Sequence, residues 1–441
     1  MSGFWSGMSP LAQDIALLIA LLCPLLLIGW AVLRGFRPWP FVRAVIWRFR
    51  WANLMFVCLI AISVGIGVAL IAQERGLRRG TAQAADKFDL VVTAPGSEIT
   101  MLLAAVYLQP TDAPLLSGAA YQAVAAHESV ALAAPLGFGD SYHGHPIVGT
   151  IPDFLQHLSD DRIEGRAFAD HFEAVVGAHV SLQPGDHFEP AHGMPPAGGA
   201  DDDHAAHAGA AFTVVGKMAP TGTPWDRAII VPIEAVWEVH GLANGHAPER
   251  AEQIGPPFDA AYFPGTPAII VRAEQLWANY ALRSEFTRAG ETMAFFPGAV
   301  LAQLYAVMGD VRQVMSVMSL VTQVLVAASV LLGLLILVLL LRRQLAVLRA
   351  LGAPARFIFA VVWSYAAVLL IAGAIWGLAL GQLATLVLSR IVSAQTDIAI
   401  SAPLGWPEYH LVAIFVCLAA VLSLLPAWAV LRTPVVAALR A

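Results

Sequence analysis

Histidine is the residue whose distribution in this 441-residue chain most suggests chemistry. Twelve of the thirteen histidines lie between positions 127 and 246. Several of them neighbour carboxylates in the segment 183–209, which is rich in Gly, Ala, Pro, His and Asp. Imidazole and carboxylate suit zinc, copper or nickel, and histidine-rich tracts are typical of metal binding. The candidate ligands of this segment are His187, His192, Asp203, His204 and His207.

The spacing of these residues leaves two interpretations open. His204 and His207 are three positions apart, but the fixed four-ligand spacing of a rigid structural zinc site does not occur. The segment is therefore either a mobile metal-loading loop, with zinc as the first candidate, or a solvated acidic loop with incidental histidines.

A second stretch with binding character is Gly137–Gly149, GFGDSYHGHPIVG, which combines glycines with Asp140 and Tyr142. Its composition favours a turn that leads into a strand. The alternative is a binding rim for a periplasmic partner.

Motifs of catalysis are missing from the sequence. ATP hydrolysis at a P-loop needs a lysine against the phosphates, and neither Lys87 nor Lys217, the two lysines, ends such a loop. The sequence has no H-E-x-x-H and no G-x-S-x-G. We therefore expect no enzymatic activity and no cofactor in this chain. A membrane enzyme with scattered catalytic residues stays open as an alternative.

The composition is that of a membrane protein. Apolar residues make up 58% of the chain and charged residues 13%. Uncharged apolar stretches of about 20 residues cross bilayers as helices. The sequence has five, at Leu11–Leu33, Leu54–Ala72, Val314–Leu341, Phe357–Leu388 and Leu411–Leu431.

The charges are distributed asymmetrically. Of the 31 acidic and 25 basic residues, 28 and 13 lie between Gln73 and Arg312. Arginines cluster at 34–50 and 342–356, and the positive-inside rule places both clusters in the cytoplasm. Three arginines after the second stretch oppose this orientation. An acidic middle segment argues against nucleic acid as a partner.

The middle segment, 73–310, mixes strands and helices and is predicted to be a large α+β extracytoplasmic domain. Short apolar runs predict strands at Phe88–Thr93, Pro146–Ile151, Ala174–Val180, Ala211–Met218, Ala228–Pro232 and Ala268–Val271. Helical periodicity predicts helices at Ile99–Tyr107, Tyr121–His127, Glu234–His240 and Glu274–Arg288.

Two of the apolar helices are predicted to extend beyond the bilayer as a stalk. The helical pattern of Gly298–Met318 continues into Val314–Leu341, and Phe357–Leu388 is longer than a bilayer requires. Gly373, Gly377 and Gly381 repeat every four residues in the latter, which favours close packing against a neighbouring helix.

A basic turn joins the third and fourth apolar stretches and reads RRQLAVLRALGAPARF, 342–357. Leucines recur in it at helical spacing between arginines, and Gly352 and Pro354 end the pattern. The chain has one span, then a large domain, then three spans. This order and the basic turn together resemble the FtsX/MacB-like permease family of type VII ABC transporters. The segments GRAF (165–168), EAVVGAHV (173–180), PGDHF (184–188) and VVGKMAPTGTPWDRAIIVP (214–232) look like the core domain of that family.

The resemblance implies a function and partners. The turn is similar to the coupling helix of the family, at 343–352, which docks on a separate MacB/LolD-like ATPase that carries ATP and Mg²⁺. The residues that fall on its motif are Arg343, Leu345, Leu348, Arg349, Leu351 and Gly352. The family usually has glutamate at the position of Gln344. The resemblance implies a multi-pass protein of the bacterial inner membrane that works as a dimer with a second permease copy. Such a protein transmits motion and does not pass solute between its helices.

The resemblance leaves the substrate open. The histidines point toward zinc, handled with a periplasmic binding protein or a lipoprotein. The alternative is an FtsX/LolC-like complex that handles lipoproteins or regulates envelope hydrolases without solute transport. The predicted domains are an extra apolar helix and basic linker (1–53), a transmembrane helix (54–72), the α+β domain (73–310) and a three-helix permease domain (311–441).

Overall fold

A computed structural model gives the structure of the chain. It describes residues 7–193, 210–288, 290–307, 342–396, 398–425 and 427–428, with scattered positions between 317 and 336. The chain forms two compact units. We call Met1–Leu77, Asp310–Ile391 and Ser401–Ala441 the helical unit, and Arg78–Gly309 with Val392–Ile400 the α+β unit.

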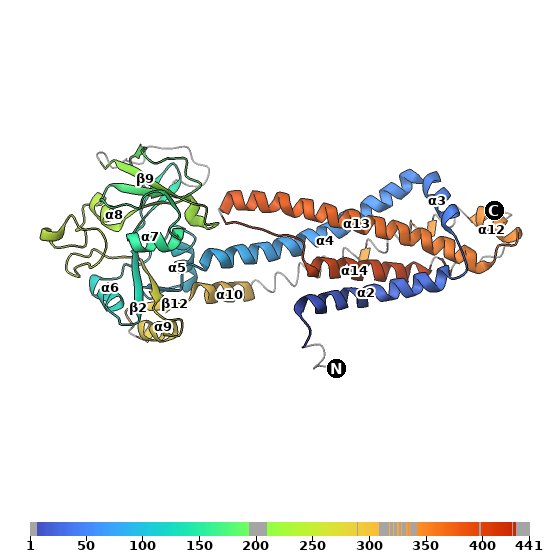
Figure 1. Cartoon of the computed structure of the whole chain (residues 1–441), viewed down its shortest axis with the longest axis horizontal. Helices are drawn as coiled ribbons and strands as arrows, with labels where there is room; N and C mark the ends of the chain where they lie inside the picture. The colour runs from blue at the N-terminus through green and yellow to red at the C-terminus, as the bar shows by residue number, and fades with distance from the viewer. Residues whose placement is uncertain are drawn as a thin grey trace. The chain divides into compact units, whose positions relative to one another are not determined.

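The helical unit is built from long apolar helices. Its helices are α2 (Pro10–Leu33), α3 (Trp39–Arg48), α4 (Arg50–Ala85), α12 (Arg342–Ala350), α13 (Ala355–Thr396) and α14 (Trp406–Leu422) (Figure 1). Among the described residues, α2, α4 and α13 are long and apolar enough to cross a membrane, and α14 is a shorter apolar helix. This confirms the prediction of apolar spanning helices at these positions.

Two helices are longer than the apolar stretches that predicted them. At about 1.5 Å per residue, the 36 residues of α4 measure about 54 Å and the 42 residues of α13 about 63 Å, against a hydrocarbon core of about 30 Å. The sequence after Ala72 contains good helix formers and no proline, so α4 continues to Ala85. Most of the predicted stretch Val314–Leu341 lies outside the described residues, as does the end of Leu411–Leu431.

Helix α13 packs against α4 through its glycines. A Cβ atom added to Gly373, Gly377 or Gly381 would come within 2.5–2.7 Å of a side chain of α4. The side chains that it would meet belong to Ile60, Val64 and Val68. Such contacts are too short for any larger residue, so the two backbones approach closely along this face.

Hydrogen bonds between side chains and backbone tie the other helices together. The Trp363 indole donates to the carbonyl of Ala420, which joins α13 to α14 (3.1 Å). The His410 Nε2 lies 3.1 Å from the carbonyl of Asp14, which joins α14 to α2. The extra N-terminal helix has no buried residue, and it packs against the core of this unit through the partly buried Leu25, Ile28 and Val32.

An ion pair joins the start of α14 to α4. The Arg75 guanidinium lies 2.8 Å from the carboxylate of Glu408, whose side chain is fully buried. The same carboxylate accepts a hydrogen bond from the Gly405 N–H and so caps α14. Arg75 is one of the arginines that opposed the positive-inside orientation, and its charge is balanced within the fold.

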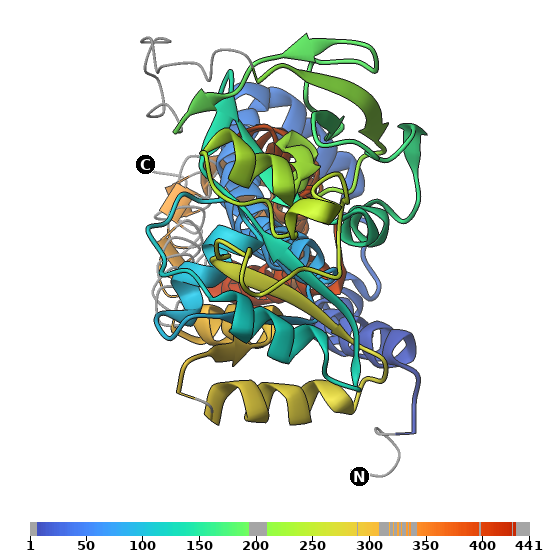
Figure 2. The ribbon, with the colours of Figure 1, turned by 90° about the vertical axis from the view of Figure 1, so that its left-hand side faces the viewer.

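The α+β unit contains two sheets (Figures 1 and 2). The smaller sheet has the order β12-β1-β11-β2, and the larger has the order β5-β9-β6-β10-β4-β3-β8, with β7 paired to β9. Its strands are β1 (Leu90–Thr93), β2 (Val130–Leu136), β3 (Asp140–Tyr142), β4 (His145–Thr150), β5 (Ile163–Gly165), β6 (Glu173–Val176), β7 (His187–Phe188), β8 (Ala191–His192), β9 (Phe212–Met218), β10 (Ile229–Pro232), β11 (Ala268–Ala273) and β12 (Met293–Phe295). This confirms the predicted α+β class.

Helices cover the two sheets. They are α5 (Glu98–Ala105), α6 (Gly118–Ala125), α7 (Pro152–Ser159), α8 (Ile233–Val239), α9 (Ala278–Arg288) and α10 (Pro297–Val307), with the 3-10 turns η1 (Pro224–Arg227) and η2 (Pro248–Arg250). Helix α9 packs on the smaller sheet, where Figure 2 shows it in gold. Helix α8 packs on β4 and β10 of the larger sheet through Ala235 and Val236, which places His240 just beyond its end.

Candidate functional site

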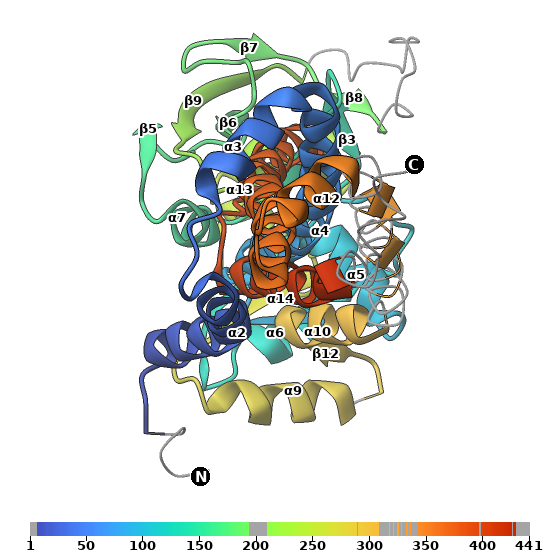
Figure 3. The same cartoon turned by 90° about the vertical axis from the view of Figure 1, so that its right-hand side faces the viewer.

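Helix α12 is the site where the sequence predicts contact with a second protein. Its leucines divide between two faces. Leu345 is buried, with 2% of its surface exposed, and Leu348 packs against the same apolar core of the helical unit. Val347 and Leu351 are exposed, at 44% and 80%. Figure 3 shows α12 at the near end of the bundle, in orange.

This division corrects the predicted docking set. Leu345 lies inside the core of its own unit, so it holds α12 in place and presents no surface to a partner. Val347, which the sequence argument did not include, takes its place on the exposed side. The side chain of Arg343 lies outside what the structure describes.

Gly352 ends α12. It has φ +97°, a backbone conformation that glycine adopts without strain. The N–H groups of Gly352 and Ala353 bond back to the carbonyls of Arg349 and Leu348, which closes the last turn. Helix α13 begins three residues later, at Ala355, so α12 is fixed at the head of the longest helix among the described residues.

The predicted metal ligands of the α+β unit separate in the structure. His187 lies on β7, and its Nδ1 is 3.0 Å from the Thr213 hydroxyl of β9. His192 lies on β8, which pairs with β3. Asp203, His204 and His207 lie outside the described residues.

His192 instead forms a cluster with two residues that the metal prediction did not include. The ligand atoms of Asp140, His192 and His240 all lie within 4.8 Å of one another. The Asp140 carboxylate is 3.4 Å from His192 Nδ1 and 3.6 Å from His240 Nε2, and its side chain is 4% exposed. We call these three residues the Asp140 cluster.

Comparison with known proteins identifies the C-terminal part of the chain. Residues 316–435 match the family model of the FtsX-like permease C-terminal domain. The chain carries an FtsX-like permease domain. This match confirms the predicted FtsX-like permease domain over residues 316–435. α12, α13 and α14 all lie within the matched residues.

Solved structures resemble the chain at low identity. The periplasmic region of MacB from Actinobacillus actinomycetemcomitans aligns at 9% identity and a TM-score of 0.30, over 52% of this chain and 95% of that one. The extracellular domain of the ABC-type transporter YknZ from Gram-positive bacteria aligns at 9% identity and a TM-score of 0.27, over 47% and 98%. No curated protein matches the chain significantly.

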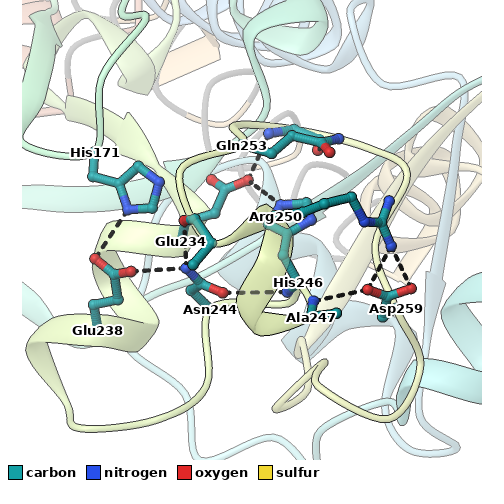
Figure 4. Close-up of polar contacts among 11 residues, drawn as sticks. His171, Glu234, Glu238, Asn244, His246, Ala247, Arg250, Gln253 and Asp259 are labelled. Carbon is teal, nitrogen blue, oxygen red and sulfur yellow. Dashed lines mark hydrogen bonds and ion pairs between the residues drawn. The ribbon is translucent and has the colours of Figure 1, made fainter.

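A second group of histidines and carboxylates lies in the interior of the α+β unit (Figure 4). The side chains of Glu234 and His246 are fully buried, with Glu234 Oε1 3.5 Å from His246 Nε2. The same oxygen accepts a hydrogen bond from the Gly255 N–H at 2.6 Å. We call Glu234 and His246 the buried pair.

Further ion pairs surround the buried pair. The His171 Nδ1 lies 3.0 Å from the carboxylate of Glu238, which also accepts from the Asn244 amide (Figure 4). The pKa of Asp259 is held below its usual value. The larger cause is the hydrogen bond from the Ala247 N–H, and the smaller is the Arg250 guanidinium. Loop residues 244–259 are thus tied to α8 by polar contacts and also by the buried ring of Phe258, which packs on Trp237.

Proposed function

We propose that this chain is the mechanotransmitting permease subunit of an ABC transporter in the bacterial inner membrane. A separate MacB/LolD-like ATPase docks on the exposed side of α12. ATP hydrolysis then moves the helices of a permease dimer, and these helices move the α+β unit outside the membrane. No solute passes between the helices.

The two faces of α12 are the observation that carries this proposal. If α12 buried both its leucine face and its opposite face, it would serve only to stabilise the helical unit and would have no surface for a partner. Here Leu345 and Ala346 are buried at 2% and 4%, whereas Leu351 keeps 80% of its surface exposed. A large apolar side chain that is exposed beside arginines fits a docking site on a protein.

Helix α13 supports the transmission of motion. It starts directly after α12 and runs unbroken from Ala355 to Thr396. Between Phe357 and Ser389 it contains no charged residue. Pathways for ions or protons normally include ionisable residues at membrane depth, because such residues are costly and are kept only for use. A stiff apolar rod suits the transfer of force.

Photo-crosslinking tests the docking partner. A benzoyl-phenylalanine placed at Leu351 of the full chain in its own membrane is expected to crosslink to a protein that carries a P-loop. Gln344 is exposed on the same helix and provides a second position on α12. Leu242, exposed in the α+β unit, serves as the control position and should give no such product.

The products are identified by mass spectrometry. An ATP-binding protein recovered at Leu351 and absent at Leu242 supports the proposal. Equal recovery at both positions, or recovery of no ATPase at Leu351, contradicts it.

A further inference from the structure

The Asp140 cluster has the geometry of a metal site, and its position is set by the backbone. β3 and β8 are antiparallel, and Asp140 lies directly opposite His192 in their register. The Gly193 N–H donates to the carbonyl of Gly139 (2.8 Å), and the Ser141 hydroxyl donates to the carbonyl of Gly193 (2.6 Å). These bonds hold the two strands together on both sides of the pair. Figure 3 labels β3 and β8 side by side.

His240 brings the third ligand from a different element. It follows α8, and its Nδ1 lies 2.7 Å from the carbonyl of Val236. A carbonyl can only accept, so Nδ1 carries the proton and the lone pair of the neutral ring is on Nε2. That lone pair faces the carboxylate of Asp140. Histidine ligands of metal ions are typically oriented in this way by a backbone carbonyl.

The separations of the ligand atoms show what fits between them. A charged N–H···O⁻ hydrogen bond measures about 2.7–2.9 Å. Two ligand atoms that are each about 2.0–2.2 Å from one tetrahedral zinc ion lie about 3.4 Å apart. The observed separations from Asp140 Oδ1 are 3.4 Å to His192 Nδ1 and 3.6 Å to His240 Nε2. These two separations match the edges of a zinc tetrahedron, and all three ligand atoms lie within 4.8 Å of one another.

The structure assigns a zinc-type transition-metal site to Asp140, His192 and His240. One carboxylate and two imidazoles are a donor set that zinc accepts, with the fourth position left to water or to an incoming ligand. The His192 side chain is 63% exposed, so the open position faces solvent. A three-ligand site of this kind can exchange its ion, which suits the loading or delivery of a metal. The inference stands independently of the proposed ATPase docking.

Zinc titration of the full chain in detergent tests the site. Calorimetry with Zn²⁺ and the absorption of bound Co²⁺ report affinity and coordination. We expect His240→Ala and His192→Ala to weaken binding at least about tenfold and to remove the tetrahedral Co²⁺ spectrum. His187→Ala is the matched control, because His187 contacts Thr213 on another strand.

A fourth variant separates this site from the histidine-rich segment. His204→Ala combined with His207→Ala should leave the tetrahedral Co²⁺ spectrum in place. The inference is overturned if this double variant loses the spectrum while His240→Ala keeps it, or if His192→Ala binds Zn²⁺ like the unchanged chain. Because His192 lies on the surface, its replacement leaves the fold intact, and thermal unfolding in EDTA checks this for each variant.

Discussion

The helical unit and the α+β unit hold their elements together by different contacts. In the helical unit, glycines of α13 bring its backbone against α4, and a Cβ atom at any of the three would overlap α4. In the α+β unit, loops and helices are joined by carboxylates bonded to histidine, arginine and backbone N–H groups. The helical unit should therefore be sensitive to added volume, and the α+β unit to the loss of a polar partner.

The difference in contacts also suggests what each unit can do. Two helices packed as closely as α4 and α13 move as one body, which suits the transmission of force. A unit with polar clusters at its surface and interior can bind ions or polar ligands. The buried pair and the Asp140 cluster then differ in access, since the buried pair is closed to solvent and the Asp140 cluster is open.

The largest expected effect is that of added volume in the helical unit. Gly377→Leu places a side chain where Val64 Cβ would be 2.6 Å from the first added atom. We expect a loss of about 3 kcal/mol or more, measured by thermal unfolding in detergent. Ala379→Leu is the matched control, because Ala379 is exposed on the same helix. Equal unfolding midpoints for the two variants would break the comparison.

A smaller effect is expected when a partner is removed from the buried pair. Glu234→Ala leaves the buried Gly255 N–H without its acceptor and removes the carboxylate that lies 3.5 Å from His246 Nε2. The expected loss is about 2–4 kcal/mol in the free energy of unfolding. Glu249→Ala, an exposed carboxylate of the same region, should change stability by less than about 0.5 kcal/mol. A stable Glu234→Ala variant would show that packing alone holds this loop.

The smallest effect concerns an exposed ion pair and depends on pH. The Arg166 guanidinium, bonded to Glu173 at 2.6 Å, lowers the pKa of that carboxyl. A lowered folded-state pKa contributes stability that is present above the unfolded value of about 4.3 and is lost as pH falls through the folded value. Because Arg166 is more than half exposed, the contribution should not exceed about 1 kcal/mol.

Glu173→Gln tests this pH dependence. Thermal unfolding should show the variant less stable than the unchanged chain at pH 7, with the gap closing between about pH 5 and pH 3. A gap that stays constant over this range would assign the contact to packing rather than to charge.

The sequence predicted those elements whose signal is local. Apolar runs such as Ala211–Met218 and Ala268–Val271 correspond to β9 and β11 because buried strands are rich in β-branched residues. The sequence argument missed β2, VALAAPL, since alanines and Pro135 weaken its strand signal and only pairing with β11 decides its structure. It also missed α7, whose eight residues are too few for a clear helical period.

The candidate sites show the same limit. Which residues of α12 are exposed depends on how the helix packs within its own unit. A periodic pattern of leucines predicts an apolar face, but it does not tell whether that face packs inside the unit or docks on a partner. The Asp140 cluster joins residues 140, 192 and 240, and no local spacing could indicate it. Asp140 does lie in the glycine-rich stretch that the sequence marked as a turn or a binding rim, so a partial signal was present.

The central claim is that ATP hydrolysis by a separate ATPase docked on α12 moves the α+β unit. Spin labels at Ala44 on α3 and Leu242 in the α+β unit, both exposed, can report this in a chain whose Cys23, Cys58 and Cys417 are replaced by serine. The chain is reconstituted with the ATPase captured at Leu351, and the distance between labels is measured without nucleotide and after vanadate trapping. We expect the distance to change on trapping and to stay fixed in Leu351→Asp. An unchanged distance while ATP is hydrolysed would contradict the account.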